Sequence, residues 1–170
     1  PTAKQWLSVL VSSGIVILLE PFSSNALKRV IKAPRMYFAD TGLCAHLMGW
    51  SSGTVLENSI MSGAFFETWV VTEIYKSYLN VGKRPPLYFY RDSNKKEIDL
   101  IIYKDGTVYP IEIKKSSAPK AAVKNFSVLD VFEKSESELK TAVGTGGVVC
   151  MAADVVPIDK KNWYIPAWLI

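Results

Sequence analysis

Four polar side chains interrupt segments that are otherwise apolar, and their types are those that bind a divalent cation. Glu67 falls at the centre of the apolar stripe of an expected helix, where an unpaired buried carboxylate is costly. Asp99 lies in an expected strand, and Glu112 and Lys114 lie two residues apart in the next one. If these strands pair with their polar faces together, Asp99, Glu112 and Lys114 share one side of the sheet, and a helix laid there adds Glu67.

Such a cluster supports metal-assisted phosphoryl chemistry. Two or three carboxylates that leave coordination positions open form a site for Mg²⁺ or Mn²⁺. The metal would polarise a phosphate and stabilise the charge of an in-line displacement, while Lys114 would position a water or lower its pKa. Each residue alone also has a simpler interpretation: a solvated Glu112–Lys114 ion pair, a strand-edge Asp99, and a Glu67 that reaches solvent past the helix end. Their combination, in this order, favours the metal site.

The elements that must position these residues follow a simple order. Residues 57–79 predict one long amphipathic helix, residues 87–91, 97–103 and 108–114 predict strands, residues 119–132 a helix, and residues 147–152 an apolar strand. Asp105-Gly106 predicts a tight hairpin turn. Alternation places Ile98 with Leu100 and Ile102 on one face of the second strand. The fold class is therefore α/β with a mixed sheet, followed by a short aromatic tail at residues 163–170.

Residues 1–50 predict the back half of a winged helix, with a helix at 4–13, strands at 15–19 and 36–38, and a basic loop as the wing. Asp40 is expected to cap a short helix that runs to Met48. Five basic residues are candidates for nucleic-acid contacts: Lys28, Arg29, Lys32 and Arg35 in this wing, and Lys115 beside the expected cleft. A solvated loop or a protein-docking surface is the alternative. For Arg91, an ion pair with Asp92 or Glu97 is the simplest interpretation.

Composition excludes several other classes. With 170 residues, 49% hydrophobic and 21% charged, the chain can bury a core and is not disordered. The widely spaced Cys44 and Cys150 and the single His46 exclude a zinc ribbon, a disulfide scaffold and a His-based triad, and they suit the reducing cytoplasm. The net charge of +4 permits a polyanionic partner. The apolar stretch 6–19 is too short to span a membrane, and Pro1 in place of an initiator Met indicates a piece of a longer protein.

The segments Phe65-Phe66-Glu67, Glu97-Ile98-Asp99-Leu100 and Ile111-Glu112-Ile113-Lys114 resemble the motifs of the PD-(D/E)XK, or restriction-endonuclease-like, nuclease superfamily. The resemblance implies an αβββαβ core over residues 51–170, with Ile98 in place of the motif's variable proline. It also implies that Asp99 and Glu112 bind the metal with the Ile113 carbonyl, that Glu67 assists the metal or its water, and that Lys114 orients or activates the nucleophile.

A closer resemblance covers nearly the whole chain. Lys32 to Leu43, Gly63 to Glu67, Tyr90 to Ser93 and Ile165-Pro166-Ala167-Trp168 are similar to the C-terminal domain of unknown function in a prokaryotic AAA-type ATPase family. This resemblance implies a preceding ATPase module, which is absent here because no GxxxxGK[ST] motif occurs. The leading hypothesis is a metal-dependent DNA nuclease under ATPase control. The alternative is a catalytically silent nuclease fold that binds DNA or protein for the ATPase; a fragment inert outside an ATPase oligomer, and a homo-oligomer, are left open.

Overall fold

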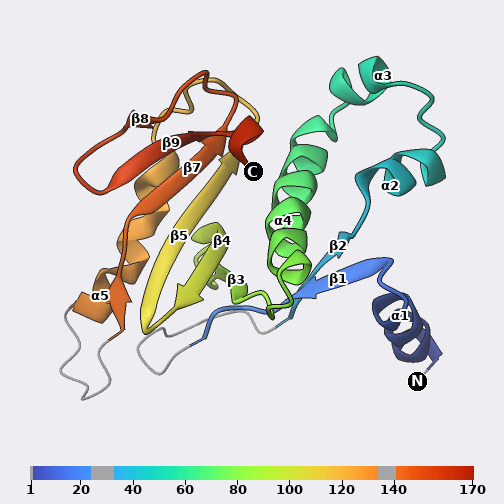
Figure 1. Ribbon diagram of the computed structural model, residues 1–170, viewed down its shortest axis with the longest axis horizontal. Coiled ribbons are helices and arrows are strands. Elements are labelled where there is room, and N and C mark those ends of the chain that lie inside the picture. Colours follow the sequence, from blue (N-terminus) through green and yellow to red (C-terminus); the bar gives the residue numbers. More distant parts are fainter. Residues whose placement is uncertain (1, 24–32, 134–140) are drawn as a thin grey trace.

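A mixed sheet organises the chain (Figure 1). The computed structural model describes residues 2–23, 33–133 and 141–170, and within these ranges seven strands join in this sheet. They are β3 (Leu87–Arg91), β4 (Glu97–Lys104), β5 (Thr107–Lys114), β6 (Ala142–Val143), β7 (Gly146–Cys150), β8 (Val156–Pro157) and β9 (Asn162–Pro166). The order is β3-β4-β5-β7-β9-β8, with β6 beside β5; β5, β7 and β9 are parallel, and the other main pairs are antiparallel. The expected mixed α/β class is confirmed.

The remaining elements flank this sheet. They are α1 (Thr2–Ser12), β1 (Val16–Leu19), β2 (Arg35–Phe38), α2 (Thr41–Leu47), α3 (Gly53–Glu57), α4 (Ser62–Asn80), the 3₁₀ helix η1 (Ala122–Leu129), α5 (Asp130–Glu133) and the 3₁₀ helix η2 (Ala167–Leu169). The helix and two strands predicted within residues 1–50 are present. Asp40 caps α2 as expected, because its side chain accepts from the backbone N–H of Leu43. The loop predicted as a wing lies mostly outside the described residues.

Three predicted elements differ from the structure. The single helix predicted at residues 57–79 is two helices, because the Ser59 hydroxyl accepts from the Met61 N–H at the junction and competes with helical bonding. The helix predicted at 119–132 is mostly 3₁₀ and follows Ala121, whose φ is 55°. The aromatic tail contains a strand, β9, that extends the sheet beside β7. The hairpin turn is confirmed, since Asp105 and Gly106 have φ of 50° and 75°.

A β-bulge interrupts β4 where the sequence predicts simple alternation. The Cα pairs Tyr88–Ile101 and Tyr90–Ile98 leave one residue of β3 opposite two residues of β4, Asp99 and Leu100. Ile98 therefore packs in the same cluster as Ile101, and its predicted place beside Leu100 is wrong. Such a bulge changes the direction of the side chains around it, and here one of them is a candidate site residue.

Two apolar cores cover the two faces of the sheet. On one face, Leu100, Ile111 and Ile113 pack against Val70 and Val71 of α4. On the other, a second cluster joins β4 and β5 to η1; its central members are Ile98, Ile101, Val108, Phe126 and Leu129. Figure 1 shows α4 between the sheet and the β1–β2 hairpin, with α5 on the far side of the sheet. Side chains that alternate along one strand consequently meet different helices.

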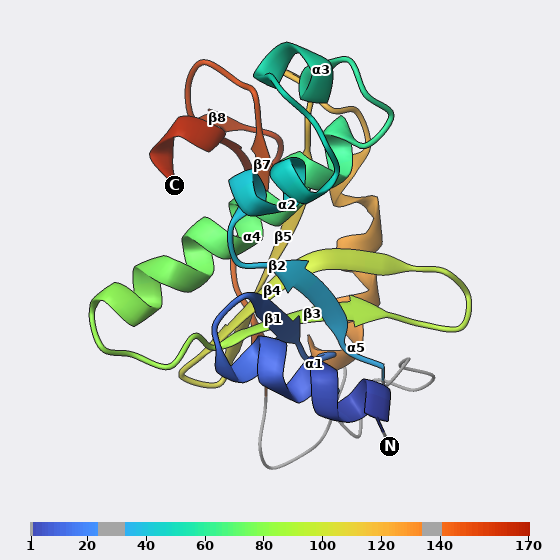
Figure 2. The ribbon, with the colours of Figure 1, turned by 90° about the vertical axis from the view of Figure 1, so that its right-hand side faces the viewer.

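The β1–β2 hairpin belongs to the α4 core. Leu19 and Tyr37 lie in the same buried cluster as Val70 and Leu100, and the Phe22 N–H donates to the Phe89 carbonyl at 2.7 Å. Figure 2, which faces the hairpin, shows α1 alongside it on the outside of the molecule. Of the helices in the described ranges, none is both long and apolar enough to cross a membrane. Residues 1–50 and 51–170 thus share part of one core.

This shared core predicts a common unfolding transition. Leu19→Ala removes a side chain that is only 2% exposed, so the free energy of unfolding should fall by about 2–5 kcal/mol. Urea denaturation followed by tryptophan fluorescence and by circular dichroism should give one coincident transition for wild type and variant. Leu10→Ala, at an exposed position of α1, is the control and should cost much less. Two separate transitions would show that the hairpin does not share the core.

Candidate active site

The strands β4 and β5 separate at the point where the candidate residues lie. Their Cα pairing runs from Lys104–Thr107 to Leu100–Ile111 and does not continue to Asp99. Instead, the Asp99 carboxylate accepts a hydrogen bond from the Ile113 N–H at 2.9 Å through Oδ2. Asp99 is 5% exposed, so its carboxylate lies buried in the opening between the two strands. The bulge and the end of the ladder together place a charged group inside the sheet.

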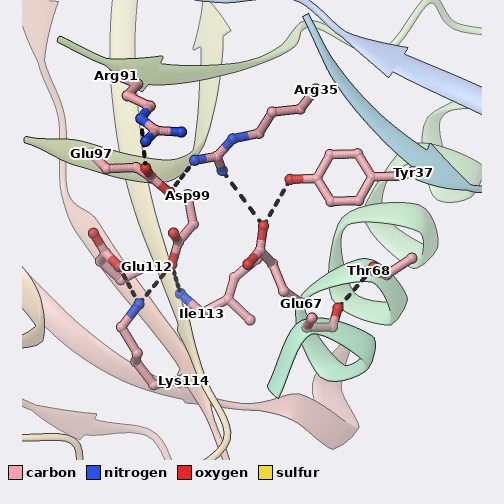
Figure 3. A network of polar contacts seen from close by, with 11 residues as sticks. Arg35, Tyr37, Glu67, Thr68, Arg91, Glu97, Asp99, Glu112, Ile113 and Lys114 are labelled. Atoms are coloured by element: carbon pink, nitrogen blue, oxygen red, sulfur yellow. Dashed lines mark hydrogen bonds and ion pairs between the residues drawn. The ribbon is translucent and has the colours of Figure 1, made fainter. Parts of the chain in front are cut away.

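Lys114 joins the two buried carboxylates. Its Nζ lies 2.9 Å from Asp99 Oδ2 and 2.7 Å from Glu112 Oε2 (Figure 3). The Glu112 side chain is 4% exposed, whereas the Lys114 side chain is 43% exposed. The structure thus brings three of the four predicted residues into direct contact, with the lysine on the solvent side of the cluster.

A cavity of about 260 Å³ opens onto this cluster. The sheet contributes Glu97, Asp99, Glu112 and Lys114 to its wall, and the segment leading into η1 contributes Pro119, Lys120, Ala121, Ala122 and Asn125. The Asn125 side-chain amide donates to the Glu97 carbonyl at 2.9 Å and ties this segment to the start of β4. The cavity offers the carboxylates a route to small ligands.

The cluster distributes its charge unevenly. Burial alone would raise the pKa of Asp99, but hydrogen bonds with Glu112 and Lys114 and the lysine charge lower it. Burial, together with the hydrogen bond and charge of Asp99, raises the pKa of Glu112 to about 8. Burial opposes the charge of Lys114, but the two carboxylates outweigh it and raise the pKa of Lys114. Near neutral pH, one carboxylate is ionised, the other holds a proton, and the lysine is charged.

Glu67 lies apart from this cluster. Because α4 covers the opposite face of the sheet from Glu112 and Lys114, Glu67 does not line the cavity. Its Oε1 accepts from the Tyr37 hydroxyl at 2.8 Å and lies 3.5 Å from Arg35 Nη1. Burial and the charge of Asp99 raise the pKa of Glu67 in spite of both contacts. Glu67 is therefore close enough to feel Asp99, but its partners come from β2.

The β2 residues form a second polar network that the sequence analysis did not predict. Arg35 pairs with Glu97 as well as Glu67, and its guanidinium lies 4.6 Å from the centre of the Phe89 ring. Arg91 also contacts Glu97, at 3.5 Å, which agrees with the simplest interpretation of that arginine. Arg35 and Tyr37 are two residues apart in a strand and must share a face, so this alternation was the available signal.

The remaining predicted nucleic-acid contacts are only partly visible. Lys28, Arg29 and Lys32 lie outside the described residues. Arg35 is 19% exposed in its side chain, and its charge is used in the network around Glu97 and Glu67. Lys115 is 27% exposed in its side chain and lies 3.6 Å from the Glu57 carboxylate. These two cations already have partners inside the fold.

The donor set fits a loosely held Mg²⁺ or Mn²⁺. In the described part of the chain, no group of three or more His, Cys, Asp or Glu residues is arranged to hold a metal ion. Two carboxylates that face a polar cavity still match the ligand set of Mg²⁺, which commonly uses one or two carboxylates and completes its shell with waters and phosphate oxygens. The metal would have to compete with the Lys114 ammonium and with the proton on Glu112.

The fold and site define an α/β domain with a carboxylate–lysine cluster at a fork between two strands. Residues 62–170 match the family described as "Domain of unknown function (DUF4143)", and residues 1–54 match "Domain of unknown function (DUF8612)". The first match covers more than half of the chain, which therefore belongs to the DUF4143 family.

Two curated relatives are similar to this chain over 118 residues, both at 32% identity. They are uncharacterised proteins of Mycobacterium bovis and Mycobacterium tuberculosis. The similarity covers 69% of this chain but 26% of each relative, so the matched part is about a quarter of those proteins. No solved structure matches the chain.

The raised pKa of Glu112 predicts a pH-dependent stability in metal-free protein. Folded Glu112 keeps its proton up to about pH 8, whereas the ordinary value is 4.5, so between these values the folded state binds more protons than the unfolded state. This contribution is present in full at low pH and is lost as pH rises toward 8. Glu112→Gln should remove it and flatten the fall in the free energy of unfolding by more than about 1 kcal/mol.

Urea titrations in EDTA at several pH values between 5 and 8.5 measure this effect. Glu57→Gln is the matched control, because Glu57 is a glutamate with a side chain 73% exposed. The control should keep the wild-type slope. Equal slopes for wild type and Glu112→Gln would contradict the shared-proton arrangement at Asp99 and Glu112.

Proposed function

We propose that this chain is the nuclease-like domain of a larger ATPase-containing protein and hydrolyses DNA phosphodiester bonds with Mg²⁺ or Mn²⁺. The observation that carries the proposal is the contact of Lys114 with two buried carboxylates, Asp99 and Glu112, on the wall of one cavity. Burying two acids and aiming them at one lysine is costly for stability alone, so a chemical role explains the arrangement.

The order of elements supports the same proposal. The sequence α4, β3, β4, β5, η1, β7 follows the αβββαβ order of restriction-endonuclease-like nucleases, with β5 and β7 parallel. In that comparison, α1, β1 and β2 correspond to part of a winged helix. The ATPase is inferred from the family resemblance, and it agrees with relatives in which the matched part is only 26% of the protein.

Each cluster residue has a role in this proposal. Asp99 and Glu112 would hold the metal, which when bound stabilises charge on the phosphate and lowers the pKa of a water. Glu112 must lose its proton to do so, and the cavity admits the phosphate. Lys114 donates hydrogen bonds to the attacking water and orients it, because a metal between the carboxylates releases its ammonium from them. Cys44 and Cys150 are both free, in agreement with work in the cytoplasm.

Calorimetric titration with Mn²⁺ and a plasmid-cleavage assay test the proposal. Asp99→Ala should abolish Mn²⁺ binding and cleavage, and Lys114→Ala should lower the cleavage rate by at least about 100-fold, as expected for a group that acts on the nucleophile. Asp154→Asn, at an exposed position outside the cavity, is the control and should behave as wild type. Unchanged Mn²⁺-dependent cleavage in Asp99→Ala would refute the assignment.

A second candidate function is a silent nuclease fold that binds DNA or protein for the ATPase. The observation in its favour is that Lys114 already compensates both carboxylates without a metal. Salt-dependent DNA binding by wild-type protein that takes up no Mn²⁺ and cleaves nothing would select this function over the enzyme.

A further inference from the structure

Glu67 is held on the far side of the fork by two residues of β2. The Tyr37 hydroxyl donates to Glu67 Oε1 at 2.8 Å, and Arg35 Nη1 lies 3.5 Å from the same oxygen. Figure 3 shows the Glu67 carboxylate turned toward these two side chains, while the Asp99 carboxylate faces Lys114. The third carboxylate that a strong metal site needs is present, but it is directed elsewhere.

The two arms of this tether differ in strength. Tyr37 is 6% exposed, and burial raises the pKa of its hydroxyl, which keeps its proton and donates a full hydrogen bond. Arg35 Nη1 is buried, and within the described residues it has no hydrogen-bond partner, so at 3.5 Å its contact with Glu67 is only an ion pair. The tyrosine is therefore the residue whose removal most directly releases Glu67.

The tether also joins the two family segments. Tyr37 and Arg35 lie in residues 1–54, which match one family, whereas Glu67 and the cluster lie in residues 62–170, which match another. The β1–β2 hairpin packs against α4, and Tyr37 belongs to the core beneath it. A shift of the hairpin relative to α4 would consequently move the donors that hold Glu67.

We propose that Tyr37 and Arg35 act as a clamp that withholds Glu67 from the Asp99–Glu112 cavity, and that movement of the β1–β2 hairpin releases Glu67 to complete a three-carboxylate metal site. This inference rests on the proposed metal site and adds its regulation. Two carboxylates and a competing lysine hold a divalent cation weakly, and a third oxygen ligand raises the affinity. The segment matched by the first family would thus control the site of the second.

Mn²⁺ titration of the whole chain tests the clamp. Tyr37→Phe keeps the buried ring and removes only the hydroxyl, so it should bind Mn²⁺ about 3- to 10-fold more tightly than wild type, as expected for one lost hydrogen bond. The double variant Tyr37→Phe/Glu67→Gln should lose this gain. Tyr90→Phe is the matched control, because Tyr90 is equally buried and its hydroxyl contacts Asp92 instead.

Thermal unfolding without metal supplies a readout of the contact itself. Tyr37→Phe and Glu67→Gln should each lower the midpoint temperature, and the double variant should lower it by less than the sum of both shifts, because the two changes break the same hydrogen bond. Additive shifts would show that the contact does not couple the two residues and would overturn the clamp.

The outcomes separate the clamp from the proposed function. Wild-type Mn²⁺ binding that Asp99→Ala abolishes supports the metal site, and equal affinity in Tyr37→Phe then overturns the clamp alone. If wild type takes up no Mn²⁺ and Tyr37→Phe binds it through Glu67, the clamp stands and the two-carboxylate site fails. A tighter Tyr37→Phe whose gain persists in the double variant also overturns the clamp, because Glu67 is then not the added ligand.

Discussion

The contact of Lys114 with two buried carboxylates is the interaction on which the site depends. Asp99 cannot stay ionised inside a sheet without a compensating charge, and Lys114 Nζ at 2.9 Å and the Ile113 N–H at 2.9 Å supply that compensation. The cost is accepted where β4 and β5 have already separated, so no ladder hydrogen bond is lost to the side chain. The fork and the lysine therefore require each other.

The fork also explains why the site has two sides. Alternation along β5 sends Glu112 and Lys114 toward η1, whereas Ile111 and Ile113 pack toward α4. Asp99, at the bulge, lies between the two sides: Lys114 contacts it directly, and its charge reaches Glu67 across the opening. A residue placed in this way can transmit changes on the α4 side to the cavity without a large movement of the sheet.

The sequence predicts most of this fold and part of the site. Apolar alternation identifies β3, β4, β5 and β7, and Asp105-Gly106 identifies their hairpin, because these signals are local. The bulge at Asp99 and Leu100 leaves no mark in the apolar pattern, since both neighbours, Ile98 and Ile101, are apolar on either face. The face that α4 covers, and hence the partners of Glu67, depends on packing against β2, which lies 30 residues away in the chain.

Charge balance connects stability with chemistry in this site. The ionised Asp99 faces the Lys114 ammonium, Glu112 holds a proton, and Arg35 faces Glu97 and Glu67, so the arrangement is nearly compensated without a metal. A compensated site folds stably, but it binds a cation only if that cation displaces both a proton and an ammonium group. Such displacement makes affinity sensitive to any added negative charge in the cavity. Glu67, held on the α4 side by Tyr37, is the nearest described group that could add one, which makes the position of β2 the natural point of control.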